Sequence, residues 1–204
     1  MAANVETMFY TRTKPWHGLG TMVEEAPTSR EALEAAGLNW QVIQKNLVTD
    51  SGIVVPGFKA NLRETDQQVL GVVSDRYKVV QNEEAFAFTD ALLGEGVTYE
   101  TAGSLQNGRR TWILAKLPAR YIISGDEVTP YLVFMNSHDG SGSIKAAMTP
   151  IRVVCQNTLN LALSTAKRSW YGRISAMALA TACRAAPPVP SPLKSGKPLP
   201  TTRR

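Results

Sequence analysis

The amino-acid sequence predicts an α+β fold with a mostly antiparallel, twisted β-sheet and helices packed on one face. Short β-rich runs separated by turn residues recur from Trp40 to about Thr149, as in a sheet of antiparallel strands. Only a few segments combine helical spacing of apolar residues with capping residues. Six of the twelve prolines fall between Pro187 and Pro200, which predicts a disordered, Pro-rich C-terminal tail.

These patterns divide the 204-residue chain into three regions. Residues 1–23 are predicted to form an N-terminal arm, irregular over residues 9–23, where Pro15, Gly18 and Gly20 interrupt any regular structure. Residues 24–170 are predicted to be the α+β domain, which is long enough to bury a real core. Residues 171–204 are predicted to be a basic, low-complexity tail.

Three helices are expected. Thr28 or Ser29 caps the first, which runs through Ala36, and Glu31 favours its positive end. Asn82 is expected to cap the second helix, which the glycines after Leu93 end. The third is expected from about residue 157.

The strands are expected at residues 40–48, 58–63, 68–74, 97–105 and 109–117, with two more flanking residues 138–143. Asn107 and Gly108 are the pair that type I′ turns prefer, so the strands on either side of them form the clearest hairpin.

The net charge of +5 comes from the C-terminal end of the chain. Seven of the 22 basic residues and none of the 17 acidic ones follow Lys167. The high isoelectric point therefore does not by itself indicate nucleic-acid binding, and local clusters must decide. Cys155 and Cys183 have the spacing of neither a disulfide framework nor a zinc site. The sequence has no apolar run long enough to span a membrane and no evident export signal. We therefore expect a cytoplasmic protein.

One local cluster of cations follows the predicted hairpins. Arg109 and Arg110 follow the Asn-Gly turn, Lys116 ends that strand, and Lys145 and Arg152 lie on the next hairpin. Strand alternation places Arg110 and Trp112 on one face, with Arg109 and Ile113 on the other. Arginine beside aromatic rings is how single-stranded nucleic acids are held, although a solvated sheet face is about equally compatible with the pattern.

The turn at residues 138–143 is the second candidate feature. It is rich in Gly, Ser and Asp, so the backbone N–H groups of His138, Gly140, Ser141 and Gly142 are predicted to face a phosphate. Trp112 or Tyr131 is predicted to stack on bases. Scattered acidic residues and only two histidines predict no metal site and no cofactor. A Cys155–His138 catalytic pair is the less favoured reading, since Cys155 lies in an apolar strand.

Four motifs in order resemble the phage/plasmid-like protein family (domain of unknown function 932) over about residues 8–170. They are Pro15–Gly20, Val73–Glu84, Asn136–Gly142 and Arg152–Leu159. The resemblance implies a phage, prophage or plasmid setting and no established catalytic activity. At the level of fold, the order of elements is similar to single-strand annealing recombinases, which implies a basic groove and assembly of subunits along DNA.

The sequence therefore predicts a non-catalytic protein that binds and anneals single-stranded DNA in recombination or replication, with DNA favoured over RNA and assembly into a homo-oligomer expected. Two other classes stay open: a host-interaction or anti-defence protein of a mobile element, and an enzyme that uses Cys155.

Overall fold

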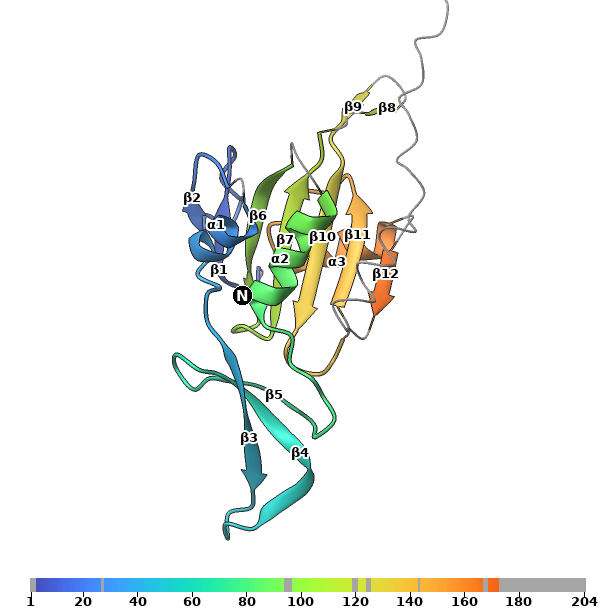
Figure 1. Cartoon of the computed structure of the whole chain (residues 1–204). Coiled ribbons are helices and arrows are strands. Elements are labelled where there is room, and N and C mark those ends of the chain that lie inside the picture. The colour runs from blue at the N-terminus through green and yellow to red at the C-terminus, as the bar shows by residue number, and fades with distance from the viewer. Residues whose placement is uncertain are drawn as a thin grey trace, which may run out of the picture.

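A computed structural model describes residues 3–26, 28–93, 97–118, 121–123, 126–142, 144–166 and 169–172. The predicted tail at 171–204 lies almost entirely outside them. The mixed α and β architecture with mostly antiparallel sheets confirms the predicted fold class (Figure 1). No helix among these residues has the length and apolar character needed to cross a membrane.

The large sheet has seven strands in the order β12-β11-β10-β7-β6-β1-β2. Their bounds are Val5–Tyr10 (β1), Thr21–Met22 (β2), Thr98–Leu105 (β6), Arg110–Lys116 (β7), Tyr131–Ser137 (β10), Ile144–Thr149 (β11) and Ser169–Gly172 (β12). All neighbours pair antiparallel except β1 and β2. Strands β1 and β2 both come from the predicted N-terminal arm, so the end of β1 and the whole of β2 are regular where residues 9–23 were expected to be irregular.

The small sheet is a separate meander of three antiparallel strands, Val42–Val48 (β3), Val54–Arg63 (β4) and Val69–Ser74 (β5). It projects from one end of the large sheet (Figure 1). Two short strands, Tyr121–Ile123 (β8) and Asp126–Val128 (β9), form a further hairpin at the opposite end.

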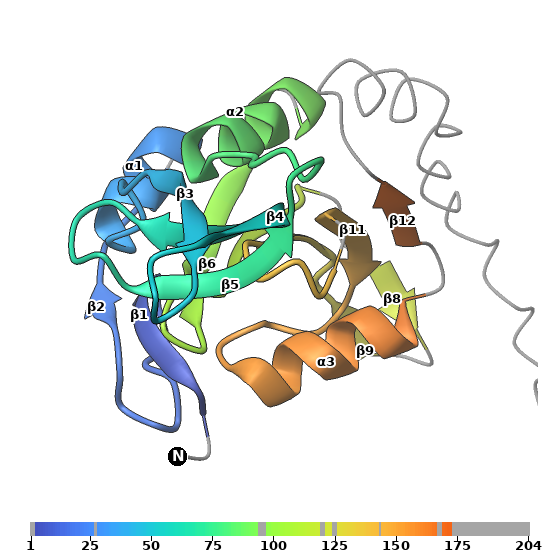
Figure 2. The same ribbon diagram turned by 90° about the horizontal axis from the view of Figure 1, so that it is seen from below.

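Helices cover both faces of the large sheet (Figure 2). Helix α1 (Ser29–Ala35) and helix α2 (Asn82–Leu93) pack on one face, where Leu33 and Phe86 meet Phe9, Ile113 and Phe134. Helix α3 (Gln156–Thr165) packs on the other face. The prediction that the helices share one face therefore holds only for α1 and α2.

The physical reason lies in the central strand β7, in which five consecutive residues from Thr111 to Ala115 are buried. Ile113 and Ala115 belong to the core under α1 and α2, whereas Trp112 and Leu114 belong to the core under α3. A strand that is apolar on both sides needs a layer on each. The sheet is thus the middle layer of three.

Two local predictions meet different outcomes. Thr28 and Glu31 form the expected capping box at α1, with the backbone N–H of Glu31 donating to the Thr28 hydroxyl at 3.2 Å. Asn82 does not cap α2, because its side chain lies in the interior: its amide donates to the carbonyl of Leu38, and its Oδ1 accepts from the hydroxyl of Thr111.

Candidate nucleic-acid interface

The predicted Asn-Gly turn brings Arg109 and Arg110 to the end of the large sheet from which the small sheet projects. Asn107 and Gly108 both have positive φ (57° and 82°), and the N–H of Arg109 bonds the carbonyl of Gln106, as in a type I′ turn. A Cβ at residue 108 would lie 3.3 Å from the guanidinium of Arg63 and 3.5 Å from the ring of Trp40. The positive φ therefore favours glycine here, and a side chain would also be tightly packed against these neighbours.

The turn between β10 and β11 lies beside Arg110. Ser137 and Arg110 are paired across the strands, and a guanidinium nitrogen of Arg110 donates to the hydroxyl of Ser141 at 3.2 Å. Among the described residues, the Nε of Arg110 has no hydrogen-bond partner. The side chain of Arg109 is exposed and forms no ion pair within the described part of the chain.

Two of the four backbone N–H groups predicted to face a phosphate already have acceptors within the protein. The N–H of His138 bonds the carbonyl of Arg109 at 2.8 Å, and the N–H of Ser141 bonds the carboxylate of Asp139 at 2.8 Å. The N–H groups of Gly140 and Gly142 have no such acceptor in the described structure. The turn can therefore offer an anion two backbone donors, fewer than predicted.

Asp139 places a negative charge inside this turn. Although its burial acts to raise the pKa, hydrogen bonds from Ser137 and Ser141 lower the pKa of Asp139 below its ordinary value. The carboxylate therefore stays ionised and partly offsets the charge of Arg110. It fixes the turn, because an ionised carboxylate accepts several donors at once.

Lys59 on β4 is a cation at this junction that the sequence analysis missed. It shares the body-facing side of the small sheet with Asn61 and Val73, since Lys59 is paired with Val73. The amide of Asn61 donates to the carbonyl of His138 at 2.7 Å, and Val73 packs against Gly140. Strand alternation in the sequence places Lys59 and Asn61 on the same face of β4. The sequence alone does not indicate that this face packs against the turn at residues 138–142.

We use the name junction cluster for Lys59, Arg109, Arg110 and the turn at residues 138–142. Tyr77 fastens the connection after β5 to the same place, because its hydroxyl donates to the carbonyl of Ser137 at 2.8 Å. The cluster carries three cations against the single carboxylate of Asp139. Its two arginines and its turn are the part of the predicted site that the fold brings together.

His138 is a buried structural residue. Its Nε2 lies 2.9 Å from Oδ1 of Asn82, and its ring packs edge-on against Trp40 with centroids 5.4 Å apart. Burial lowers the pKa of His138 to about 4, so the ring is neutral at pH 7. The ring lies on the α2 side of the sheet, whereas Cys155 lies in the core under α3, so the two do not form a catalytic pair in this fold.

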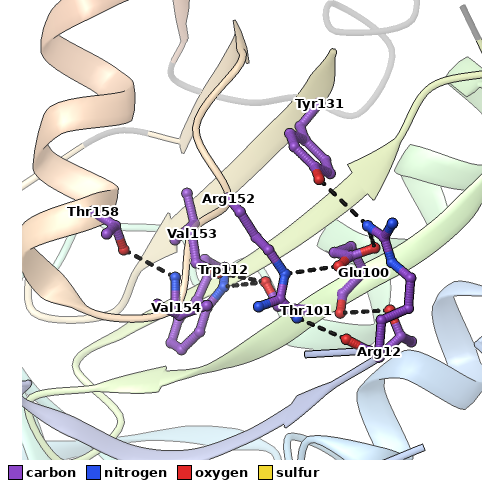
Figure 3. A network of polar contacts seen from close by, with 10 residues as sticks. Arg12, Glu100, Thr101, Trp112, Tyr131, Arg152, Val153, Val154 and Thr158 are labelled. Atoms are coloured by element: carbon purple, nitrogen blue, oxygen red, sulfur yellow. Dashed lines mark hydrogen bonds and ion pairs between the residues drawn. The ribbon is translucent and has the colours of Figure 1, made fainter. Parts of the chain in front are cut away.

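Trp112, Tyr131 and Arg152 lie in a different place, a buried polar network beneath α3 (Figure 3). Trp112 is fully buried, and its Nε1 donates to the hydroxyl of Thr101 at 3.2 Å. Tyr131 is 6% exposed. Neither ring is accessible to a base, which corrects the predicted stacking role of both.

Glu100 is the centre of that network, and its side chain is only 3% exposed. Arg152 donates to Oε1 at 2.7 Å and Arg12 donates to Oε2 at 2.6 Å (Figure 3). Glu100 is the extra residue where the β6–β7 register shifts between Tyr99 and Thr101, and such a bulge redirects a side chain. The guanidinium of Arg152 is therefore engaged by a buried carboxylate that it shares with Arg12, and this geometry does not favour its predicted contact with phosphate.

The two remaining cations also lie apart from one another. Lys116 is at the end of β7 opposite Arg110, a separation of about 20 Å at the usual rise per residue. Lys145 is half-buried on β11, opposite Met135. Of the predicted basic residues, only Arg109 and Arg110 lie together at the junction, while Lys145 lies two strands away.

The comparisons with known proteins place the chain in a family. No curated protein and no solved structure matches it. Residues 69–173 match the family described as "Domain of unknown function (DUF932)", from the start of β5 past the end of β12. The match contains three of the four motifs quoted above, including the turn at residues 136–142, and spans just over half of the chain. The chain therefore belongs to the DUF932 family.

Proposed function

We propose that this protein binds single-stranded nucleic acid, with DNA favoured over RNA, through the junction cluster and without catalysis. The observation that carries the proposal is a turn with two free N–H groups that adjoins Arg110 and lies next to the strand positions of Arg109 and Lys59. Phosphates are held by such cations, and backbone donors fix their position. The proposed setting is annealing during recombination or replication of a phage, prophage or plasmid in the cytoplasm.

The proposed site is narrower than the sequence suggested. With Trp112 and Tyr131 in the interior, base stacking contributes nothing from these two rings, and affinity comes from phosphate contacts. Binding of this kind has little sequence preference and weakens steeply with salt. It also predicts modest affinity, because only a few charges meet the backbone.

The test is a titration of a fluorescently labelled oligothymidine, followed by anisotropy between about 50 and 200 mM salt. The variant Arg109→Ala/Arg110→Ala should lower the slope of log K against log salt by up to about 1.4, since each lost phosphate contact on a single strand contributes about 0.7. Lys14→Ala/Lys116→Ala removes the same charge elsewhere and should leave the slope unchanged.

Two results would overturn the proposal. One is a wild-type chain that does not bind the oligonucleotide at the lowest salt. The other is an equal loss of slope in both double variants, because general charge attraction would then account for the binding. A duplex of the same length, titrated in parallel, tests the stated preference for single strands.

A further inference from the structure

The small sheet has an apolar face that points away from the large sheet. Its other face carries Asn61 and Val73 and meets the turn at residues 138–142. Strand register places eight residues on the outer face: Ile43, Leu62 and Val69 in one row, Lys45, Ala60 and Val72 in the next, and the pair Phe58 and Ser74 in the third. Six of these eight positions are apolar.

Part of this face is open to solvent, whereas Ala60 and Leu62 on its central strand are only 8% and 9% exposed. Phe58, Val69 and Val72 are 51%, 47% and 53% exposed, although each is a strand residue of a type usually buried. Among the residues that the structure describes, no helix or strand packs over them (Figure 1). A sheet with one apolar face is stable in water when that face is covered by another layer.

We propose that the outer face of the small sheet packs against the same face of a second copy of this chain. A second copy brings an identical apolar face, and aligned packing of two such sheets is a common sheet-on-sheet geometry. A two-fold axis along β4 would stack Phe58 on Phe58 and Leu62 on Leu62, with the small Ala60 between them. The two polar positions, Lys45 and Ser74, lie on the outer strands, where their polar groups reach water.

Face-to-face packing is favoured over extension of the sheet at its edge. Lys45 is exposed on the edge strand β3, where its ammonium group lies 2.5 Å from the side-chain oxygen of Gln67. A lysine on an edge strand discourages pairing with another strand. The apolar side chains, in contrast, all point out of the sheet plane, so the face is the better contact.

The size of the face sets the strength of the association. Three strands over about five residues cover roughly 15 by 17 Å at ordinary strand spacings. Two such faces together bury on the order of 500–800 Å², below the roughly 1,200 Å² of standard stable interfaces. The dimer is therefore weak and depends on protein concentration.

Sedimentation velocity of the full chain tests this, after nuclease treatment and at about 0.5 M NaCl, where exposed charges are screened and apolar contacts persist. Between about 10 and 500 µM the apparent mass should rise toward twofold, as expected for a weak interface. Val72→Lys should keep the chain monomeric at every concentration. Phe58→Ser should have the same effect without adding a charge.

Leu161→Lys is the matched control, because Leu161 is 51% exposed on α3, almost the same as Val72, and lies far from the small sheet. It should associate like the wild type, and circular dichroism should show all variants folded. A wild-type chain that stays monomeric, or a Val72→Lys variant that associates like the wild type, overturns the proposal. Because no nucleic acid is present, this outcome does not depend on the proposed function.

Discussion

The partly buried Arg152 forms an ion pair with the buried Glu100, with the Nε of Arg152 2.7 Å from Oε1 of Glu100. The same guanidinium donates to the carbonyl of Thr11 at 2.7 Å, so it joins the loop after β1 to the strand β6. Arg152, which the sequence analysis predicted to contact phosphate, thus helps to hold the N-terminal segment against the sheet.

Replacement of Glu100 by glutamine should destabilise the fold by about 2–4 kcal/mol, because two guanidinium groups lose their buried counter-charge. Urea denaturation measures the change. Glu34→Gln is the control: Glu34 pairs with Arg30 on the exposed side of α1, and its loss should cost no more than about 0.5 kcal/mol. Equal effects in the two variants would show that the network is not the anchor described here.

Arg152→Ala and Arg109→Ala should separate stability from nucleic-acid binding. Arg152→Ala should lower the free energy of unfolding and leave the salt slope of oligonucleotide binding unchanged, because its guanidinium faces Glu100. Arg109→Ala should do the reverse, since its side chain is exposed and unpaired within the described residues. Anisotropy titrations and urea denaturation on the same samples check both. A lower salt slope for Arg152→Ala would return Arg152 to the interface.

Much of the fold could be predicted from the sequence because its signals are local. The capping box of Thr28 and Glu31, the Asn107-Gly108 turn and the alternation in each strand depend on neighbours in sequence. The existence and order of most strands and of all three helices follow from such patterns. The N-terminal strands lacked a signal of this kind, because Pro15 and the glycines near it dominate that region.

The candidate site was harder to predict because it depends on contacts between distant segments. Lys59 lies near the turn at residues 138–142 only because the small sheet packs against that turn. Glu100 reaches Arg12 and Arg152 only through a bulge. The burial of Trp112, in contrast, could have been predicted from its neighbours in the sequence. It lies in an uninterrupted apolar run from Trp112 to Ala115, which indicates a strand covered on both faces.

The neutral ring of His138 predicts a specific pH dependence of stability. Burial lowers its pKa to about 4 from an ordinary 6.5, so the unfolded chain binds the proton more readily between these values. Stability should therefore fall as pH decreases from 6.5 toward 4, by up to about 1.4 kcal/mol per pH unit from this group.

The comparison with His138→Gln isolates this contribution, because glutamine can still donate to Asn82 but does not titrate here. The carboxylates and His17 are common to both chains, so their effects cancel in the difference. The stability advantage of the wild type should shrink between pH 6.5 and 4, as measured by urea denaturation at several pH values. A difference that stays constant over that range would contradict a buried neutral histidine.

Gly71→Ala should disturb the contact between the small sheet and the rest of the molecule. A Cβ at residue 71 would lie 2.5 Å from the Cα of Asp139 and 2.8 Å from its carbonyl oxygen, and backbone atoms cannot move aside easily. We expect a loss of about 1–3 kcal/mol in thermal or urea denaturation. Gly142→Ala is the matched control, since its nearest neighbour would be Cβ of Ser137 at 3.8 Å, an ordinary contact. Wild-type stability in Gly71→Ala would mean that the two sheets are not in contact there.

The pairing of β1 with β6 has a consequence for the order in which this protein can assemble on the ribosome. Phe9 lies opposite Ala102, so the first strand to be synthesised waits until β6 has emerged before its antiparallel partner exists. The small sheet, in contrast, is a meander of neighbours in sequence and can close while later residues are still being added. Until β6 arrives, Phe9 has no core to enter, and this interval is when the nascent chain is most exposed to aggregation.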